Sequence, residues 1–271
     1  MKQLEDLLPL EKMDSLALRA TEYQHAKPFP HIVFDDFLAP EIIAELVRDF
    51  PGPEDHAWLR YRAPAEKDKL QSTSELQMPP TVRGIINAFN SSTFVKFLEK
   101  LTGIEGIVPD PHLFGGGMHQ TLPGGHLKVH IDYNFHAKWK LDRRLNVLLY
   151  LNEDWQEEWN GHLELWEGDR ENLRERTHRI LPLANRLVIF NTDERSWHGV
   201  PEPLLCPPGR TRKSIALYYY SNGRPEEERG DVHNTVFLAR PGEKISTPIR
   251  AHLREWVPPA LLKLARRGKP D

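Results

Sequence analysis

Cysteine, long apolar runs and excess charge are all scarce in this sequence, and each scarcity excludes a class of protein. The 271 residues include one cysteine, Cys206, so a disulfide framework is excluded and a cytoplasmic location is expected. The first residues lack the apolar stretch of a signal peptide, and no run of about 18 apolar residues predicts a membrane-spanning helix. A net charge of −3 provides no basic field. Neither nucleic acid nor a membrane is therefore an expected partner.

What is present is the composition of a folded globular protein. Hydrophobic residues make up 39% of the chain and charged residues 28%, with a mean hydropathy of −0.57. This length is enough for a large core. We expect a single domain over 1–271, with a helical lead-in and possible lid at 1–112, a catalytic core at 113–222 and a C-terminal extension at 223–271.

The first hundred residues carry mostly helical signals. Leucines at helical spacing predict helix within 1–26, and Pro40 followed by an apolar face predicts a helix over 40–49. Another apolar face predicts a helix over 81–101, which Gly103 would end. Between them we expect a short strand at 31–34 and an irregular segment at 51–80 that is a candidate lid. A short basic amphipathic helix is predicted at 258–267.

From about residue 113 the hydrophobic period changes from helical spacing to alternation. Leu127, Val129 and Ile131 alternate with His126, Lys128 and His130. Further short apolar runs follow at 145–151, 162–166, 186–190 and 214–220, separated by turn residues. The pattern predicts a β-sandwich or jelly roll. The fold class is therefore mainly β with flanking helices (α+β).

His130, Asp132 and His198 form the most informative set. On a strand, residues i and i+2 face the same side, so His130 and Asp132 would present an imidazole and a carboxylate together. If the fold brings His198 to the same spot, two nitrogens and one oxygen would face one side of a metal. That set suits ferrous iron with positions left for a co-substrate and dioxygen.

The histidines allow two competing interpretations. An isolated H-x-D often occurs by chance on the polar face of a strand. His126 and His130 would share a face of a helix, as in zinc hydrolases, but Leu127 stands where those enzymes have the catalytic glutamate. The strand alternation also argues against a helix here, and we expect His126 to be a wall or surface residue on the same strand face.

Arg212 is the candidate for an anionic co-substrate. It lies two residues before Ser214, at the start of an apolar strand, where a guanidinium can clamp a carboxylate and a hydroxyl can add a hydrogen bond. The competing interpretation is a surface arginine in a basic turn. Tyr133, Asn134 and Arg144 flank the strand ends and are either substrate contacts or ordinary rim residues.

Taken together, these motifs resemble the iron- and 2-oxoglutarate-dependent dioxygenases, in particular their prolyl 4-hydroxylase-like branch. The resemblance rests on H-x-D, a histidine 66 residues after Asp132, and R-x-S, and it covers about 113–222. Three further segments resemble strands of that family: Leu145-Asn146-Val147-Leu148-Leu149-Tyr150-Leu151-Asn152, Gly161-His162-Leu163-Glu164-Leu165 and Trp197-His198-Gly199-Val200.

The resemblance implies a double-stranded β-helix, the jelly-roll core, with Fe(II) held by His130, Asp132 and His198. The keto-acid end of 2-oxoglutarate would bind the metal, and its distal carboxylate would meet Arg212 and Ser214. Asn146 matches a position near that carboxylate. Gln120 matches a position often occupied by a co-substrate-binding tyrosine. For both, a structural role in lining the barrel is an equal alternative.

The implied reaction consumes O2 and 2-oxoglutarate, releases succinate and CO2, and hydroxylates a C–H bond. The carboxylate of Asp132 favours hydroxylation, because halogenating relatives lack it. The expected substrate is a small molecule such as an amino acid, sugar or secondary metabolite. A protein or peptidyl-prolyl substrate is the alternative, and a non-enzymatic jelly roll that binds a metal or ligand is the alternative of another class.

Overall fold

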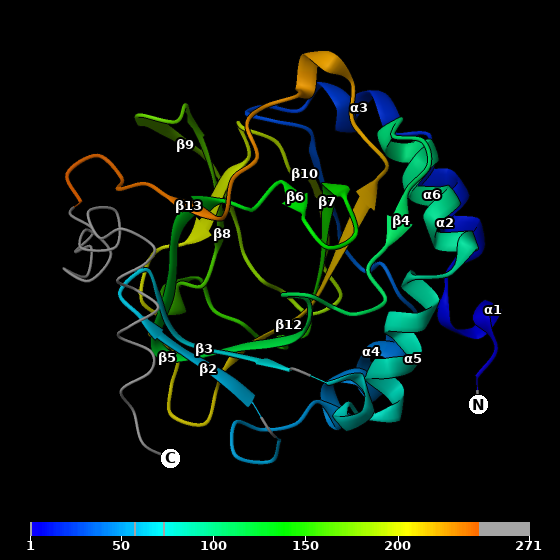
Figure 1. Ribbon diagram of the computed structural model, residues 1–271. Coiled ribbons are helices and arrows are strands. Elements are labelled where there is room, and N and C mark those ends of the chain that lie inside the picture. Colours follow the sequence, from blue (N-terminus) through cyan, green and yellow to red (C-terminus); the bar gives the residue numbers. More distant parts are fainter. Residues whose placement is uncertain (1, 57, 73, 244–271) are drawn as a thin grey trace, which may run out of the picture.

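A computed structural model describes residues 2–56, 58–72 and 74–243 (Figure 1). The helix predicted at 258–267 lies outside the described residues. The chain begins with a helical lead-in and continues into a large antiparallel sheet that curls on itself, so the prediction of a mainly β jelly roll with flanking helices is confirmed. The helices are α1 (Leu4–Leu7), α2 (Leu10–Ala17), α3 (Ala20–His25), α4 (Pro40–Asp49), α5 (Pro80–Phe89) and α6 (Ser92–Thr102).

The sheet has the strand order β1-β10-β7-β12-β5-β11-β8-β9, in which β12 and β5 join two four-stranded halves. Two further strands pair with β5: β3, which forms a hairpin with β2, and β13. The strands are β1 (His31–Phe34), β2 (Trp58–Ala63), β3 (Glu66–Ser72), β4 (Val108–Pro109), β5 (Gly117–Ile131), β6 (Phe135–His136), β7 (Leu141–Tyr150), β8 (Leu163–Gly168), β9 (Leu173–Ile180), β10 (Leu187–Asn191), β11 (Trp197–Val200), β12 (Arg212–Ser221) and β13 (Val236–Phe237).

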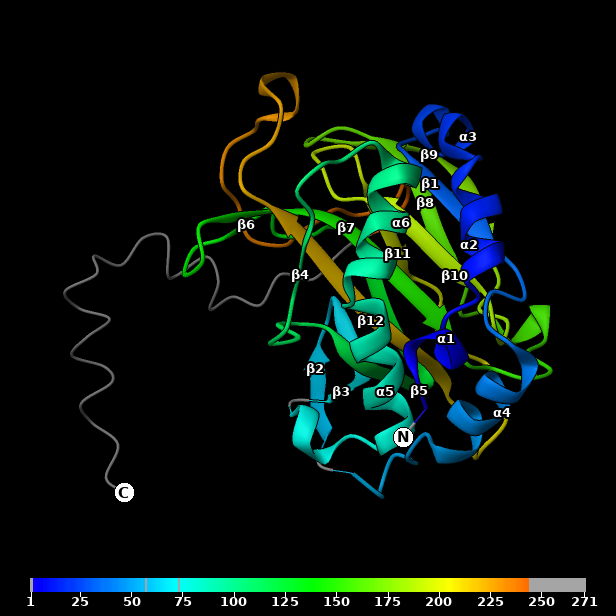
Figure 2. The same cartoon turned by 90° about the vertical axis from the view of Figure 1, so that its right-hand side faces the viewer.

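The helices cover one face of the half formed by β1, β10, β7 and β12 (Figure 2). Alternate residues of these strands, such as Leu145, Val147 and Leu149 on β7, are fully buried with the helices in the largest hydrophobic cluster. The residues between them, such as Asn146 and Leu148, face the interior of the curled sheet. One face of β7 therefore builds the core and the other builds a cavity.

Two predictions about the lead-in need correction. The helix expected over 81–101 is two helices, because Ser91 caps α6 by accepting a hydrogen bond from the backbone N–H of Phe94. Gly103 ends α6 in the left-handed conformation, as expected. The segment at 51–80 is not irregular: β2 and β3 form a hairpin within it, and β3 pairs with β5. Its strands carry many charged residues and have no alternating pattern of burial, so the sequence gives no strand signal there.

No helix in the part of the chain that the structure describes is long and apolar enough to cross a membrane.

Candidate active site

His130, Asp132 and His198 meet inside the curled sheet. His130 lies near the end of β5, Asp132 follows that end directly, and His198 on β11 pairs with His130 across the two strands. Nε2 of His130 lies 3.7 Å from Oδ1 of Asp132, and Nε2 of His198 lies 3.6 Å from Oδ2. One donor atom from each of the three residues lies within 4.8 Å of the others, so the set has the spacing to hold one metal ion.

Both imidazoles are oriented by backbone carbonyls. Nδ1 of His130 is 2.8 Å from the carbonyl oxygen of Lys128, and Nδ1 of His198 is 2.8 Å from that of Ser196. In each ring Nδ1 donates to the carbonyl, which leaves the Nε2 lone pair turned toward Asp132. Histidine ligands of metals are typically held in this way by a hydrogen bond at the other ring nitrogen.

Asp132 is fixed by two side chains of β7. Its Oδ2 accepts hydrogen bonds from Arg143 at 2.9 Å and from Nδ2 of Asn146 at 2.8 Å. Arg143 also donates to Oδ1 of Asn146 at 2.7 Å, which closes a three-membered network. The carboxylate is therefore held in one orientation beside the two imidazoles.

Burial and neighbouring charges set the protonation states of this group. Burial, reinforced by His198, lowers the pKa of His130 to about 3, and burial also lowers the pKa of His198. Burial alone would raise the pKa of Asp132, but Arg143 and the two histidines outweigh it and hold that pKa below its usual value. At neutral pH the site therefore offers two neutral imidazoles and a charged carboxylate, which are the protonation states that bind a metal.

Arg143 was not identified from the sequence, although it is central to the site. It is buried, with its guanidinium 3.6 Å from the ring centroid of Tyr218 and 4.7 Å from that of Tyr133. Burial alone would lower the pKa of Arg143, but Asp132 outweighs it and raises that pKa. A permanent cation thus sits between aromatic faces and the carboxylate.

Arg212 and Ser214 lie on β12 in the wall of the same cavity. Nε of Arg212 donates to the carbonyl oxygen of Gly161 at 2.6 Å, and a terminal nitrogen donates to the hydroxyl of Tyr150 at 3.2 Å. These bonds fix the guanidinium in the wall, so Arg212 is not the exposed turn residue of the competing interpretation. Tyr150 was missed by sequence analysis, although alternation along β7 places it on the same face as Asn146 and Leu148.

The cavity has a volume of about 290 Å³. Six of the seven predicted site residues line it: His130, Asp132, His198, Arg212, Ser214 and Asn146. Asn146, however, uses both of its amide atoms on Asp132 and Arg143. The structure therefore gives it the role of orienting Asp132, in place of the predicted contact with the co-substrate.

Gln120 is the predicted site residue that lies elsewhere. It is buried, but its amide donates to the carbonyl oxygen of Pro51 and accepts from the hydroxyl of Thr211. The residues on either side of it, His119 and Thr121, line the cavity instead. The assignment of Gln120 to co-substrate binding is therefore wrong by one position along the strand.

A β-bulge explains this error. His198 pairs with His130 and Val200 with Leu127, so β5 has one more residue than β11 over this interval. Before the bulge odd-numbered residues face the cavity, and after it even-numbered residues do. The same bulge turns His126 away: its Nε2 contacts the carbonyl oxygen of Pro64, and it does not line the cavity. The expectation that His126 shares a face with His130 is corrected accordingly.

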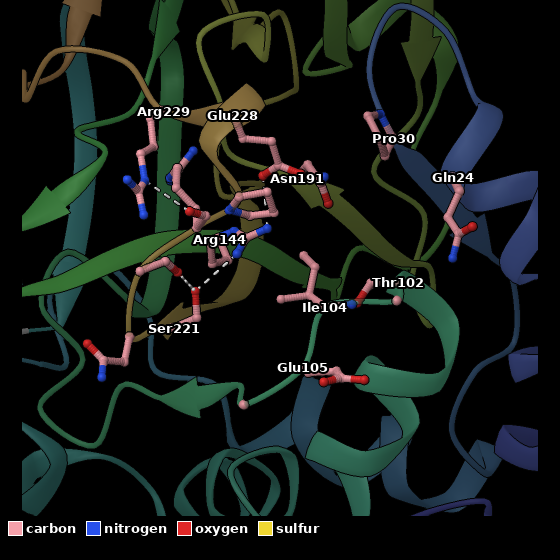
Figure 3. Close-up of a pocket in the computed structure, with 16 residues that line it drawn as sticks. Gln24, Pro30, Thr102, Ile104, Glu105, Arg144, Asn191, Ser221, Glu228 and Arg229 are labelled. Carbon is pink, nitrogen blue, oxygen red and sulfur yellow. Dashed lines mark hydrogen bonds and ion pairs between the residues drawn. The ribbon is translucent and has the colours of Figure 1, made fainter.

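Arg144 lines a second hollow of about 680 Å³, which Figure 3 shows, and not the cavity. It donates to the hydroxyl of Ser221 at 3.1 Å and to the carboxylate of Glu228 at 2.9 Å. Arg229 and Glu105 lie at the same hollow, so its charges are mixed (Figure 3). Of the two interpretations offered for Arg144, a contact with the catalytic cavity is therefore not supported. Tyr133 does line the cavity.

Comparison with known proteins agrees with this geometry. Residues 116–220 match the family model of the 2OG-Fe(II) oxygenase superfamily. No curated protein sequence matches the chain.

Several solved structures are similar to the chain. A prolyl hydroxylase from Trichoplax adhaerens, in complex with a hypoxia inducible factor peptide fragment, is 19% identical with a TM-score of 0.56, covering 82% of this chain and 94% of its own. A Pseudomonas putida prolyl-4-hydroxylase is 20% identical with a TM-score of 0.52 and coverages of 77% and 100%. HygX from Streptomyces hygroscopicus, with nickel, 2-oxoglutarate and hygromycin B bound, is 11% identical with a TM-score of 0.50 and coverages of 76% and 92%. At these identities the likeness concerns the fold.

Proposed function

We propose that this chain, a 2-oxoglutarate- and Fe(II)-dependent dioxygenase of the 2OG-Fe(II) oxygenase superfamily, hydroxylates an unactivated C–H bond of a small molecule. The reaction consumes O2 and 2-oxoglutarate and releases succinate and CO2. The observation that carries the proposal is the convergence of His130, Asp132 and His198 on one point of a cavity inside the curled sheet.

The three residues are proposed to hold Fe(II). Two imidazole nitrogens and one carboxylate on one side of a metal form the facial set that leaves positions open for a keto acid and dioxygen. The backbone carbonyls that fix both rings, and Arg143 and Asn146 that fix Asp132, support the fit. Bound iron would supply the oxidising chemistry, and the protein supplies the geometry of the ligands and of the cavity around them.

Arg212 and Ser214 are proposed to bind the distal carboxylate of 2-oxoglutarate. Both line the cavity that contains the three candidate ligands. The guanidinium is held by Gly161 and Tyr150, so it is preorganised for a charge-assisted contact with an anion. Tyr150 contributes to the site by accepting a hydrogen bond from Arg212.

A small-molecule substrate is favoured by the cover over the cavity. Tyr61, Lys69 and Gln71 of the β2–β3 hairpin lie on one side of it, and Thr235 and Phe237 lie beside β5. A volume of about 290 Å³ is at the low end for ligand sites and leaves little room for a folded protein surface.

The test is anaerobic addition of Fe(II) and 2-oxoglutarate, followed by a succinate-release screen. We expect a weak visible charge-transfer band from the ternary complex, and succinate release above the uncoupled baseline with at least one amino acid, sugar or other metabolite. Absence of the band would contradict the iron site. A response confined to peptides would show that the substrate class is wrong.

A further inference from the structure

An aromatic shelf lies directly beside the catalytic cavity. We define it by Phe114, Tyr133, His136 and Trp139, which line a surface hollow of about 720 Å³. His136 and Trp139 belong to the hairpin formed by β6 and β7, which projects from the curled sheet (Figure 2). Tyr133 and Thr235 line both the hollow and the cavity. A ligand that leaves the cavity past these two residues therefore enters the shelf.

The shelf is not part of the hydrophobic core. Phe114 is 58% exposed, and the other three rings are partly exposed. Such a patch of large aromatic residues is unusual on a protein surface and typically marks a binding site. Its position at the edge of the cavity points to the substrate as the ligand.

The rings are arranged to accept a flat partner. The planes of His136 and Trp139 are stacked, 15° apart with centroids at 4.1 Å. Phe114 stands nearly perpendicular to His136, with centroids at 5.4 Å, and to Tyr133, at 5.9 Å. The stack covers one face of His136 and one face of Trp139, so a flat ring in the hollow would gain edge contacts with this pair and a contact with the exposed ring of Phe114.

The volume of the catalytic cavity also favours a substrate that extends into the shelf. The cavity of about 290 Å³ lies at the lower limit of the roughly 300–1,000 Å³ that ligand sites occupy, and it must hold 2-oxoglutarate as well as the reacting carbon. Most of a larger substrate must therefore lie outside the cavity. The adjoining hollow has the room, and Asn234, Thr235 and Lys138 on its lining offer polar contacts to ring substituents.

We infer that the shelf is a substrate subsite for a flat aromatic ring system, whose attached C–H group reaches past Tyr133 to the three candidate ligands. This inference rests on the proposed function and narrows its substrate class from any small molecule to ring-bearing ones. Phe114 and Trp139 would determine specificity and take no part in the chemistry.

The test uses 2-naphthol as the flat probe and decahydro-2-naphthol as its saturated, puckered match, titrated into the full-length protein without metal by calorimetry and ligand-observed NMR. We expect 2-naphthol to bind several-fold more tightly than the saturated probe. Trp139→Ala and Phe114→Ala should each weaken 2-naphthol about three- to tenfold, which is the size of one aromatic pair contact. Trp159→Ala, a partly buried tryptophan outside the hollow, is the matched control and should leave binding unchanged.

Thermal unfolding of each variant checks its folding, and Phe114→Leu provides a conservative second variant at the exposed position. Equal binding of the two probes, or 2-naphthol binding that neither Trp139→Ala nor Phe114→Ala weakens, would overturn the inference. So would a proline-rich peptide that binds through Trp139 while 2-naphthol does not.

The binding assay needs no turnover, so its outcome is separable from that of the proposed function. If 2-naphthol binding depends on Trp139 but no succinate is released with any substrate, the subsite is supported and the proposed hydroxylase activity is contradicted. With a ring-bearing substrate in hand, Trp139→Ala should raise the KM for that substrate about three- to tenfold.

Discussion

Arg143 and Arg144 are consecutive on β7 and both are buried, yet they serve two different hollows. Arg143 points into the catalytic cavity and pairs with Asp132. Arg144 points into the second hollow and pairs with Glu228, in the segment 222–235 between β12 and β13 (Figure 3). The comparison shows that the same residue type on adjacent positions supports a candidate metal ligand on one face and anchors a loop on the other.

The largest effect is expected when a candidate metal ligand on the Arg143 side is removed. We expect His130→Ala to abolish the Fe(II)–2-oxoglutarate band and turnover, a loss beyond the about 10–100-fold typical of residues that only support a ligand. The control is His126→Ala, on the same strand but outside the cavity. Anaerobic absorption spectra and succinate release measure both, and equal behaviour of the two variants would refute the assignment.

Arg212 tests whether the cavity side of the sheet also holds the co-substrate. Arg212→Ala should raise the Kd of 2-oxoglutarate about 30-fold or more, because loss of a buried charge-assisted contact costs about 2–5 kcal/mol. The exposed Arg210, in the turn before β12, gives the control variant Arg210→Ala. Titration of the anaerobic Fe(II) complex measures the Kd, and an unchanged value in Arg212→Ala would rule out the proposed role.

The two neighbouring arginines are compared directly by Arg143→Met and Arg144→Met. Arg143→Met should weaken Fe(II) binding about tenfold or more, since Asp132 loses a partner that orients it. Arg144→Met should leave Fe(II) affinity unchanged and lower the free energy of unfolding by about 1 kcal/mol, because its partner Glu228 is partly exposed to solvent. Metal titration and chemical denaturation separate the two effects; similar shifts in iron affinity would erase the distinction between the two faces.

A smaller effect is expected from pH on the metal-free protein. The pKa of His130 is about 3 in the folded state, so between the usual value near 6.5 and 3 the unfolded chain binds a proton that the folded chain does not. The free energy of unfolding should therefore fall as pH falls through this range, by up to about 1.4 kcal/mol per pH unit from this residue. Asp132, whose pKa is lowered, adds stability that is lost only at pH values below about 4.

The measurement is denaturant unfolding of the metal-free protein at pH 6.5, 5.5 and 4.5. His130→Asn should show a shallower dependence than the wild type, because it removes one of the protons taken up on unfolding. An identical slope in the two proteins would contradict the lowered pKa of His130.

Much of the fold followed from local patterns. The strand at 31–34 and the helix at 40–49 occur where proline position and apolar spacing predicted them. The hairpin of β2 and β3 was missed because charged residues occupy much of it, and its pairing with β5 is a contact distant in sequence. Polar strands of this kind are defined by their neighbours and carry little local signal.

In the site, too, local patterns predicted part of the arrangement and the pairing of distant strands decided the rest. Alternation, spacing and the family resemblance together placed His130, Asp132, His198, Arg212 and Ser214 in one candidate set, and the structure brings them to one cavity. The errors were of parity: Gln120 was assigned in place of His119 and Thr121, and Arg143 was missed.

Each of these errors lies on a strand that contains a bulge. On β7, Tyr219 pairs with Leu145 and Tyr220 with Arg143, so Arg144 is the extra residue and Arg143 turns into the cavity. An extra residue in one strand reverses which side chains face inward, and its position depends on the partner strand. The sequence by itself therefore determined the residue types and strands that build the site. Only the pairing of distant strands decided which of two neighbours, Arg143 or Arg144, faces the candidate metal ligands.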